Sequence, residues 1–145
     1  GGGVILDCSH EFDMLTYLLG PITSLTARWG KRSTVTIDAE DYVDALFCVR
    51  DVPVNLSMSY LSRNAERTMV IETEAVTIRA DLIDNTVTVN DEVFRFETNR
   101  DQWFTDQIRY FFSERKNPKL MNHLKEAADM YKKLSALKMS GNQVV

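Results

Sequence analysis

The sequence predicts an α+β fold with an open, mostly antiparallel sheet whose helices pack mainly on one face. Three observations predict this class. Segments with helical apolar periodicity stand near both ends of the chain, segments that alternate apolar and polar residues fill the middle, and tight-turn residues separate these segments. Helices at both ends with strands between them favour one sheet that is covered by helices on one side.

Length and composition are consistent with one globular domain over residues 1–145. A chain of 145 residues with 44% hydrophobic residues is long enough to bury its own core. The net charge of -4 argues against a nucleic-acid partner, because phosphate binding needs a basic surface. No apolar run approaches the roughly 18–20 residues of a membrane span. We interpret Cys8 and Cys48 as reduced thiols and expect a cytoplasmic protein without a membrane partner.

The first predicted element is a helix from Val4 to Leu19, which Gly20-Pro21 ends. Alternating apolar residues then predict seven strands, at 22–29, 41–49, 54–61, 67–73, 76–81, 86–89 and 93–96. Asp51-Val52-Pro53 is predicted to be a turn, because proline interrupts a strand ladder. Tight turns are also predicted at Asp84-Asn85 and Asn90-Asp91.

Two amphipathic helices complete the predicted fold. The first spans 101–115 and carries an aromatic cluster that its helical spacing assigns to the core: Trp103, Phe104, Phe111 and Phe112. The second begins after a capping Asn122, runs to about Met139 and stops at Gly141. Its lysines, Lys132, Lys133 and Lys138, are predicted to form a solvated face.

The outer face of the predicted sheet carries small and mixed side chains: Ser24, Thr26, Tyr42, Leu46, Cys48, Ser57 and Ser59. A flat surface of this kind can pack against a second sheet in an oligomer. The alternative is a solvated face in a monomer. The sequence therefore predicts a homo-oligomer that assembles through this face of the sheet.

The residues that carry chemistry are concentrated at the start of the chain. Asp7, His10, Glu11 and Asp13 lie within two turns of the first predicted helix. Residues three and four apart are neighbours on a helix, so Asp7 is expected to share a face with His10 and Glu11. This spacing places an imidazole that titrates near neutral pH beside a carboxylate. A second histidine, His123, is distant in the sequence, and no metal site is predicted.

The first 20 residues, GGGVILDCSHEFDMLTYLLG, resemble the motif that opens the substrate half of the glucose–fructose oxidoreductase/inositol dehydrogenase (Gfo/Idh/MocA) family. The glycine run, Asp7, His10, Asp13 and Gly20 appear in the family's order. Two residues separate Asp7 from His10, where the commoner form of the motif has three. The likeness continues more loosely through 38–42 and 60–71 and into the closing helix.

The resemblance implies an NAD(P)-dependent oxidoreductase that acts on a sugar-like or polyol substrate. Members of the family begin with a Rossmann domain, whose G-x-G-x-x-G turn follows a strand and opens a helix. This sequence contains no such turn. We therefore interpret the chain as the C-terminal substrate and oligomerisation domain of a longer enzyme. NAD or NADP is expected in the full-length protein, and we expect this fragment alone to bind no cofactor and to be inactive.

Site roles follow from the same resemblance. His10 is expected to take the proton of the substrate hydroxyl, and Asp7 to bind a neighbouring hydroxyl or hold the imidazole in the useful tautomer. Asp13 is a candidate substrate-binding residue, with a solvated acid as the alternative. Arg63 and Arg67 are candidates for binding an anionic substrate group, with surface solvation as the alternative. Two other functions stay open: a non-catalytic binding or assembly module, and a small protein with hydrolytic or metal chemistry at Asp7 and His10.

Overall fold

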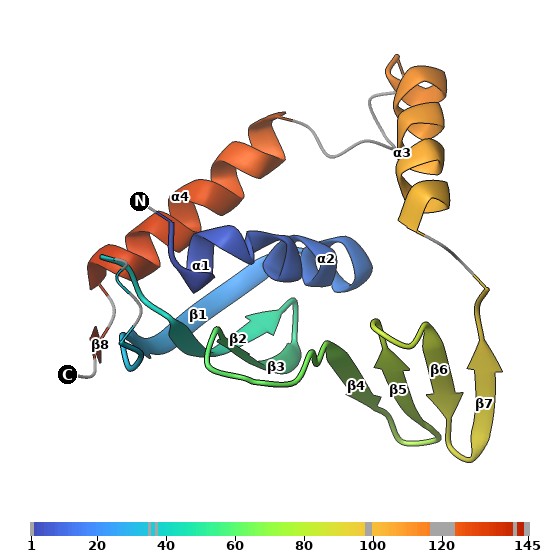
Figure 1. The fold of residues 1–145 in the computed structure, drawn as a ribbon, viewed down its shortest axis with the longest axis horizontal. Coiled ribbons are helices and arrows are strands. Elements are labelled where there is room, and N and C mark those ends of the chain that lie inside the picture. The colour runs from blue at the N-terminus through green and yellow to red at the C-terminus, as the bar shows by residue number, and fades with distance from the viewer. Residues whose placement is uncertain are drawn as a thin grey trace. The chain divides into compact units, whose positions relative to one another are not determined.

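A computed structural model of the chain describes residues 2–34, 36, 38–97, 100–116, 124–140 and 142–143. Contacts divide the chain into two units, Gly1–Leu61 with Asn122–Val145 and Ser62–Met121 (Figure 1). The described residues form four helices and mostly antiparallel strands, which confirms the predicted α+β class. The strands belong to two four-stranded sheets, whereas the sequence analysis placed them in one. That the chain acts as a single domain stays a prediction.

The first unit contains three helices that lie on one face of its sheet (Figure 1). These are α1 (Val4–Asp7), α2 (Ser9–Leu19) and α4 (Leu124–Ser140). The sequence analysis predicted one helix from Val4 to Leu19, but the backbone leaves the helical conformation at Cys8. The predicted stop at Gly20 is confirmed, and Gly20 takes a positive φ of 112° that favours glycine. The predicted cap Asn122 and stop Gly141 lie outside the described residues.

The sheet of the first unit has the strand order β3-β2-β1-β8. Its strands are β1 (Ile22–Gly30), β2 (Tyr42–Val49), β3 (Val52–Ser59) and β8 (Asn142–Gln143). β2 pairs antiparallel with both β1 and β3, whereas the short β8 runs parallel to β1. The sheet therefore brings the end of the chain next to the first strand.

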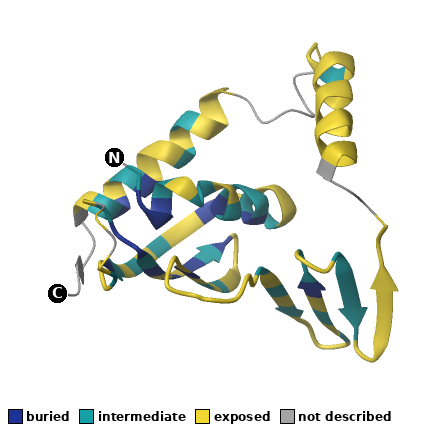
Figure 2. Ribbon diagram, viewed as in Figure 1, coloured by how far each residue is buried: buried dark blue, intermediate teal, exposed yellow. Residues whose placement is uncertain are grey.

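The predicted alternation along β2 is confirmed, and it places the core between the sheet and the helices. One face of β2 is buried through Val43, Ala45, Phe47 and Val49, while its other face is exposed or half-buried (Figure 2). The rings of Phe12 and Phe47 pack at a centroid distance of 5.6 Å and join α2 to β2. Burial of these apolar side chains holds the first unit together.

Proline 53 lies in β3, and its predicted place in a turn is wrong. The loop between β2 and β3 consists of Arg50 and Asp51, because Val49 pairs with Val52. Arg50 takes a positive φ of 55° that closes this tight connection. Pro53 is tolerated because β3 is an edge strand, where a missing N–H leaves no ladder hydrogen bond unmade if it faces outward.

The second unit is an antiparallel meander with the order β4-β5-β6-β7. Its strands are β4 (Thr68–Glu72), β5 (Thr77–Asp81), β6 (Thr86–Val89) and β7 (Glu92–Arg95). Asn85 and Asn90 both take a positive φ of 52°, which confirms the two predicted asparagine turns. Among the described residues of this unit, Ala80 is the one buried hydrophobic side chain.

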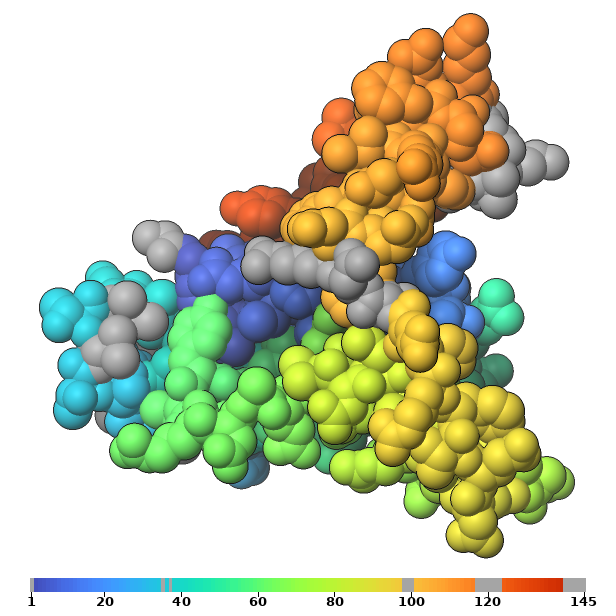
Figure 3. All heavy atoms as spheres, turned by 45° about the vertical axis from the view of Figure 1, so that its right-hand side comes forward, coloured from blue at the N-terminus to red at the C-terminus, as the bar shows by residue number. Residues whose placement is uncertain are grey.

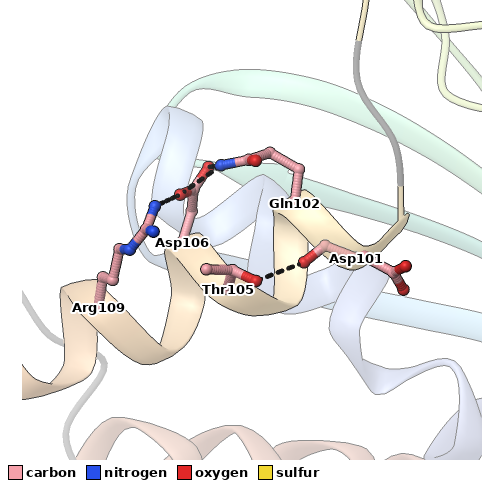
Figure 4. Close-up of polar contacts among 5 residues, drawn as sticks. All are labelled: Asp101, Gln102, Thr105, Asp106 and Arg109. Carbon is pink, nitrogen blue, oxygen red and sulfur yellow. Dashed lines mark hydrogen bonds and ion pairs between the residues drawn. The ribbon is translucent and has the colours of Figure 1, made fainter.

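Several polar side chains of helix α3 (Arg100–Glu114) form hydrogen bonds with other residues of the same helix. Gln102 and Arg109 both converge on Asp106, at 2.7 and 3.3 Å, and the Thr105 hydroxyl donates to the Asp101 carbonyl at 2.8 Å (Figure 4). The apolar side of the helix is about half exposed, and atoms of α3 lie at the surface in Figure 3 (orange). The aromatic cluster predicted as core is instead 49–61% exposed: Trp103, Phe104, Phe111 and Phe112. Periodicity identified the apolar face correctly but did not identify a surface that covers it.

We expect Leu134→Ala to lower the free energy of unfolding by about 2–5 kcal/mol, because Leu134 on α4 is fully buried and its loss leaves a cavity. The matched control is Met139→Ala on the same helix. Met139 is 89% exposed, so its truncation should change stability by less than about 0.5 kcal/mol. Urea unfolding followed by circular dichroism measures both, and equal losses would contradict the described packing of α4.

Candidate functional site

The glycine run has a structural role at the start of α1. Gly2 and Gly3 have positive φ angles of 95° and 98°, and the Gly3 carbonyl accepts the amides of Leu6 and Asp7 at 3.1 and 2.9 Å. A Cβ on Gly3 would overlap the carboxylate of Glu40. Only glycine meets both demands, so the run fixes how α1, and with it Asp7, enters the fold.

Glu40 is the buried acid that holds this segment. Its side chain is 1% exposed and accepts the Ile5 amide at 3.2 Å, while its backbone carbonyl accepts the Val4 amide at 3.0 Å. The Lys138 ammonium lies 2.8 Å from the other carboxylate oxygen and also donates to the Gly2 carbonyl at 3.0 Å. The pair is charge-assisted and hydrogen-bonded, as a buried carboxylate requires.

Lys138 therefore does not belong to a solvated face, as its position in a lysine run predicted. Its side chain is 24% exposed and reaches from α4 to the start of the chain. Lys132 and Lys133 are both exposed, as predicted, and Lys133 also donates to the Ile22 carbonyl at 3.2 Å. The sequence carries no signal for the Lys138 contact, because its partners are about a hundred residues or more away.

Asp41, the next residue after Glu40, is fully buried and organises the neighbouring loop. Its carboxylate accepts the amides of Arg32 and Ser33 at 2.8 and 2.7 Å. Burial raises the pKa of Asp41, but hydrogen bonds from Ser33 and Arg32 and the charge of Lys31 outweigh it and lower the pKa below its usual value. The Asp41 carbonyl accepts the amide of Tyr60 at 2.8 Å and so fixes the end of β3.

Asp7 meets Tyr60, a residue that the sequence analysis did not assign to the site. The Tyr60 hydroxyl donates to Asp7 Oδ2 at 2.7 Å, across 53 residues of sequence. Burial, the hydrogen bond to Asp7 and the charges of Asp7, Cys8 and Glu40 all raise the pKa of Tyr60 well above its usual value. The phenol therefore stays protonated and acts as a donor at neutral pH. The only sequence signal was its place in a stretch that resembles a family strand.

His10 lies on α2, beyond the break at Cys8, and its recorded partner is Glu11. Its Nε2 stands 3.2 Å from Glu11 Oε1, and the side chains are 59% and 15% exposed, respectively. The expectation that Asp7 pairs with His10 on one helical face depended on an unbroken helix. In the structure, Asp7 contacts Tyr60 and His10 contacts Glu11, although both residues remain at the exposed start of the same unit.

Asp13, Arg63 and Arg67 are the remaining candidates. Asp13 is half-buried on α2, in the same unit as Asp7 and His10. Arg63 is exposed and Arg67 half-buried, and both belong to the second unit, in the segment before β4. The Arg67 carbonyl accepts the Leu82 amide at 2.9 Å, which ties this segment to β5.

No three histidine, cysteine, aspartate or glutamate side chains among the described residues are grouped as metal ligands, and both cysteines are free and half-buried. No helix in the described part of the chain is both long and apolar enough to cross a membrane. Two surface hollows, at β1 with α4 and on the outer face of the sheet, are lined by residues other than Asp7 and His10, which are both exposed.

Comparison with protein families gives a match over residues 1–79 to the family described as the GFO/IDH/MocA C-terminal domain. This stretch includes the glycine run, Asp7, His10, Glu40 and Tyr60. No curated protein sequence gives a significant match.

Solved structures share the fold across nearly the whole chain. A UDP-N-acetylglucosamine 3-dehydrogenase, GnnA, from Acidithiobacillus ferrooxidans matches with a TM-score of 0.78 at 17% identity, over 95% of this chain and 47% of that one. An oxidoreductase from Thermotoga maritima matches with a TM-score of 0.75 at 17% identity, over 97% and 43%. The WlbA dehydrogenase from Bordetella pertussis, in complex with NADH and UDP-GlcNAcA, matches with a TM-score of 0.65 at 23% identity, over 99% and 45%. The chain thus spans less than half the length of these structures.

We expect Lys138→Met to lower the free energy of unfolding by about 3 kcal/mol, because it leaves the buried Glu40 carboxylate without its cation. The control Lys132→Met removes an exposed lysine 3.9 Å from Asp129 and should cost less than about 1 kcal/mol. Adding Glu40→Gln to Lys138→Met removes the unpaired charge and should recover part of the loss. Thermal unfolding measures all three variants, and a Lys138→Met variant as stable as the control would refute a structural ion pair.

Proposed function

Since the chain belongs to the GFO/IDH/MocA family, we propose that it is the substrate half of an NAD(P)-dependent oxidoreductase. In this proposal, the full-length enzyme transfers a hydride between a nicotinamide cofactor and a sugar-like or polyol substrate. The observation that carries the proposal is the exposed Asp7 held by Tyr60 at 2.7 Å, with the exposed His10 three residues further along the chain. Exposed groups of this kind suit a site that another part of the protein completes.

The described residues of this chain do not fit a dinucleotide. A dinucleotide site needs a parallel βαβ unit with a glycine-rich turn, whereas β1, β2 and β3 pair antiparallel and the parallel partner of β1, β8, has two residues. Gly2 and Gly3 already serve the start of α1 and approach Glu40. The proposal therefore assigns NAD or NADP to the rest of the full-length enzyme and assigns to this chain the handling of substrate hydroxyls and protons.

His10 is the proposed general base. Oxidation of an alcohol to a ketone releases the hydroxyl proton as hydride leaves the carbon, and an exposed imidazole can take that proton. Glu11, 3.2 Å from Nε2, favours the tautomer that carries its hydrogen on Nε2. Nδ1 is then the acceptor nitrogen. In the reverse direction the protonated imidazole returns the proton to the carbonyl oxygen.

The carboxylates are proposed to position the substrate. Asp7 is exposed and has one oxygen on Tyr60, so its second oxygen can accept a substrate hydroxyl. Asp13, one turn beyond His10 on α2, is proposed to bind a further hydroxyl. Arg63 and Arg67 are proposed to bind an anionic group of the substrate, since guanidinium groups suit phosphate and carboxylate geometry.

A nucleotide-linked sugar is the substrate class that the structural relatives support. One of them is a UDP-N-acetylglucosamine 3-dehydrogenase, and another was solved with NADH and UDP-GlcNAcA. A diphosphate would supply the anion that the arginines are proposed to bind. UDP-N-acetylglucosamine with NAD or NADP is therefore the first probe for activity.

We expect His10→Ala in the full-length enzyme to lower kcat by about 10²–10⁴-fold with UDP-N-acetylglucosamine, because the proton loses its acceptor. The control is His123→Ala, which removes the sequence's other histidine. Reduction of the nicotinamide, followed by absorbance, measures both. Turnover within twofold of wild type would reject His10 as the base.

The alternative function is a non-catalytic binding or assembly module, which predicts no turnover in any variant. The break between Asp7 and His10 at Cys8 is the observation in its favour.

The same proposal includes a homo-oligomer that forms through the outer face of the first sheet. Ser24, Thr26 and Leu46 are exposed on this face, and Leu46 is 63% exposed although it is a large apolar residue in a central strand. A shallow hollow beside it is lined in part by Cys48, Pro53 and Asn55. Arg28 and Asp44 are also exposed on this face and are paired across β1 and β2. A mixed surface of this kind suits sheet-to-sheet packing.

We expect Leu46→Asp to dissociate the oligomer, because it places an unpaired charge at the centre of the proposed interface. Leu18→Asp is the matched control, since Leu18 is 51% exposed on α2, on the helical side of the sheet. Sedimentation velocity of the full-length protein separates the two. An unchanged sedimentation coefficient for Leu46→Asp would place the interface elsewhere.

A further inference from the structure

The pairing of Tyr60 with Asp7 assigns a role to a residue outside the proposed catalytic set. We propose that Tyr60 is a positioning residue: its hydroxyl fixes the Asp7 carboxylate so that one oxygen is held and the other faces the substrate. This inference rests on the proposed function, because it concerns the hydroxyl-binding role given there to Asp7. Its structural core is the 2.7 Å hydrogen bond from Tyr60 Oη to Asp7 Oδ2.

Both members of the pair are anchored to the same two-residue segment. Glu40 holds the start of α1 through the amides of Val4 and Ile5, at 3.0 and 3.2 Å. Asp41 holds the amide of Tyr60 at 2.8 Å. The backbones that carry the two side chains are thus tied to adjacent buried residues. The contact between Tyr60 and Asp7 is therefore a product of the fold and not of a chance meeting of two surface side chains.

The two carboxylate oxygens of Asp7 have different surroundings. Tyr60 has a single hydrogen to donate, and Asp7 Oδ2 accepts it. Asp7 Oδ1 lies beside Gly2, where even an added Cβ would come within 3.3 Å of it. A side chain at this position would crowd Oδ1, and glycine leaves it open. The open oxygen is the one that a substrate hydroxyl can reach.

The charges around the pair keep the proton on the phenol. Asp7 accepts the Tyr60 hydrogen, Glu40 and the ionised form of Cys8 add negative charge that acts on the hydroxyl, and Lys138 pairs with Glu40. Burial and these negative neighbours raise the pKa of Tyr60, so the hydroxyl stays a donor across the neutral and mildly alkaline range. A donor that never ionises in this range gives Asp7 a constant orientation, which is what a positioning residue requires.

The contact is tested first without any assay of activity, on the chain itself. The Cζ signals of its five tyrosines, labelled with carbon-13, are followed through the ordinary tyrosine pKa of about 10. Tyr60→Phe identifies the Tyr60 signal, and Tyr17→Phe, which removes a tyrosine that is 85% exposed, is the matched control. We expect Tyr60 to titrate last in the wild type and clearly earlier in Asp7→Asn. A Tyr60 titration that Asp7→Asn leaves unchanged would overturn the proposal.

The positioning role is tested by a double-mutant cycle in the full-length enzyme with UDP-N-acetylglucosamine. We expect Tyr60→Phe to lower kcat/KM about tenfold, the order of one lost hydrogen bond to a charged group. Because Tyr60 acts through Asp7, the double variant Asp7→Asn/Tyr60→Phe should be no slower than Asp7→Asn alone. Losses that multiply in the double variant would overturn the proposal, since they would show that Tyr60 acts independently. The Tyr17→Phe variant should retain wild-type kcat/KM.

The two experiments distinguish failure of the positioning role from failure of the proposed function. If neither NAD nor NADP is reduced with any variant or with the wild type, the proposed function fails for this substrate, and the tyrosine titration alone decides the contact. If the wild type is active but Asp7→Asn does not shift the Tyr60 titration, the proposed function stands and the positioning role is overturned.

Discussion

The buried carboxylate of Glu40 is the interaction on which the arrangement of the first unit depends. It receives the amide of Ile5 and the ammonium of Lys138, and it leaves room only for glycine at position 3. A buried carboxylate is costly unless it is paired and hydrogen-bonded, so each of these partners is a requirement. One side chain thereby joins the start of the chain, the segment before β2 and the end of α4.

The adjacent residues Glu40 and Asp41 fix the backbone positions of the candidate site. Glu40 sets the start of α1 and so the place of Asp7, and Asp41 sets the end of β3 and so the place of Tyr60. Asp7, His10 and Tyr60 are exposed, whereas Val4 and Ile5, which precede Asp7 on α1, are buried in the core. The fold therefore ties the backbones that carry Asp7 and Tyr60 to adjacent buried residues.

The second unit and α3 show what a sequence pattern does not contain. The aromatic residues of α3 are spaced as a core face, yet they are about half exposed, and the meander of β4–β7 buries little of its apolar surface. Amphipathic spacing identifies which face of a helix is apolar, but it does not identify the surface that this face packs against. The chain spans less than half of the solved structures that share its fold.

The sequence by itself determined the class of fold, most strand positions, the asparagine turns, the stop at Gly20 and the family, because these depend on local periodicity, turn chemistry and a short motif. Only the tertiary structure decided the partners of Asp7, Lys138 and Pro53. Asp7 meets Tyr60 from 53 residues away, and Lys138 meets Gly2 from 136 residues away. The break at Cys8 also divides a segment that was predicted as one helix. Contacts between distant segments arise from the packing of whole elements, and no local pattern encodes them.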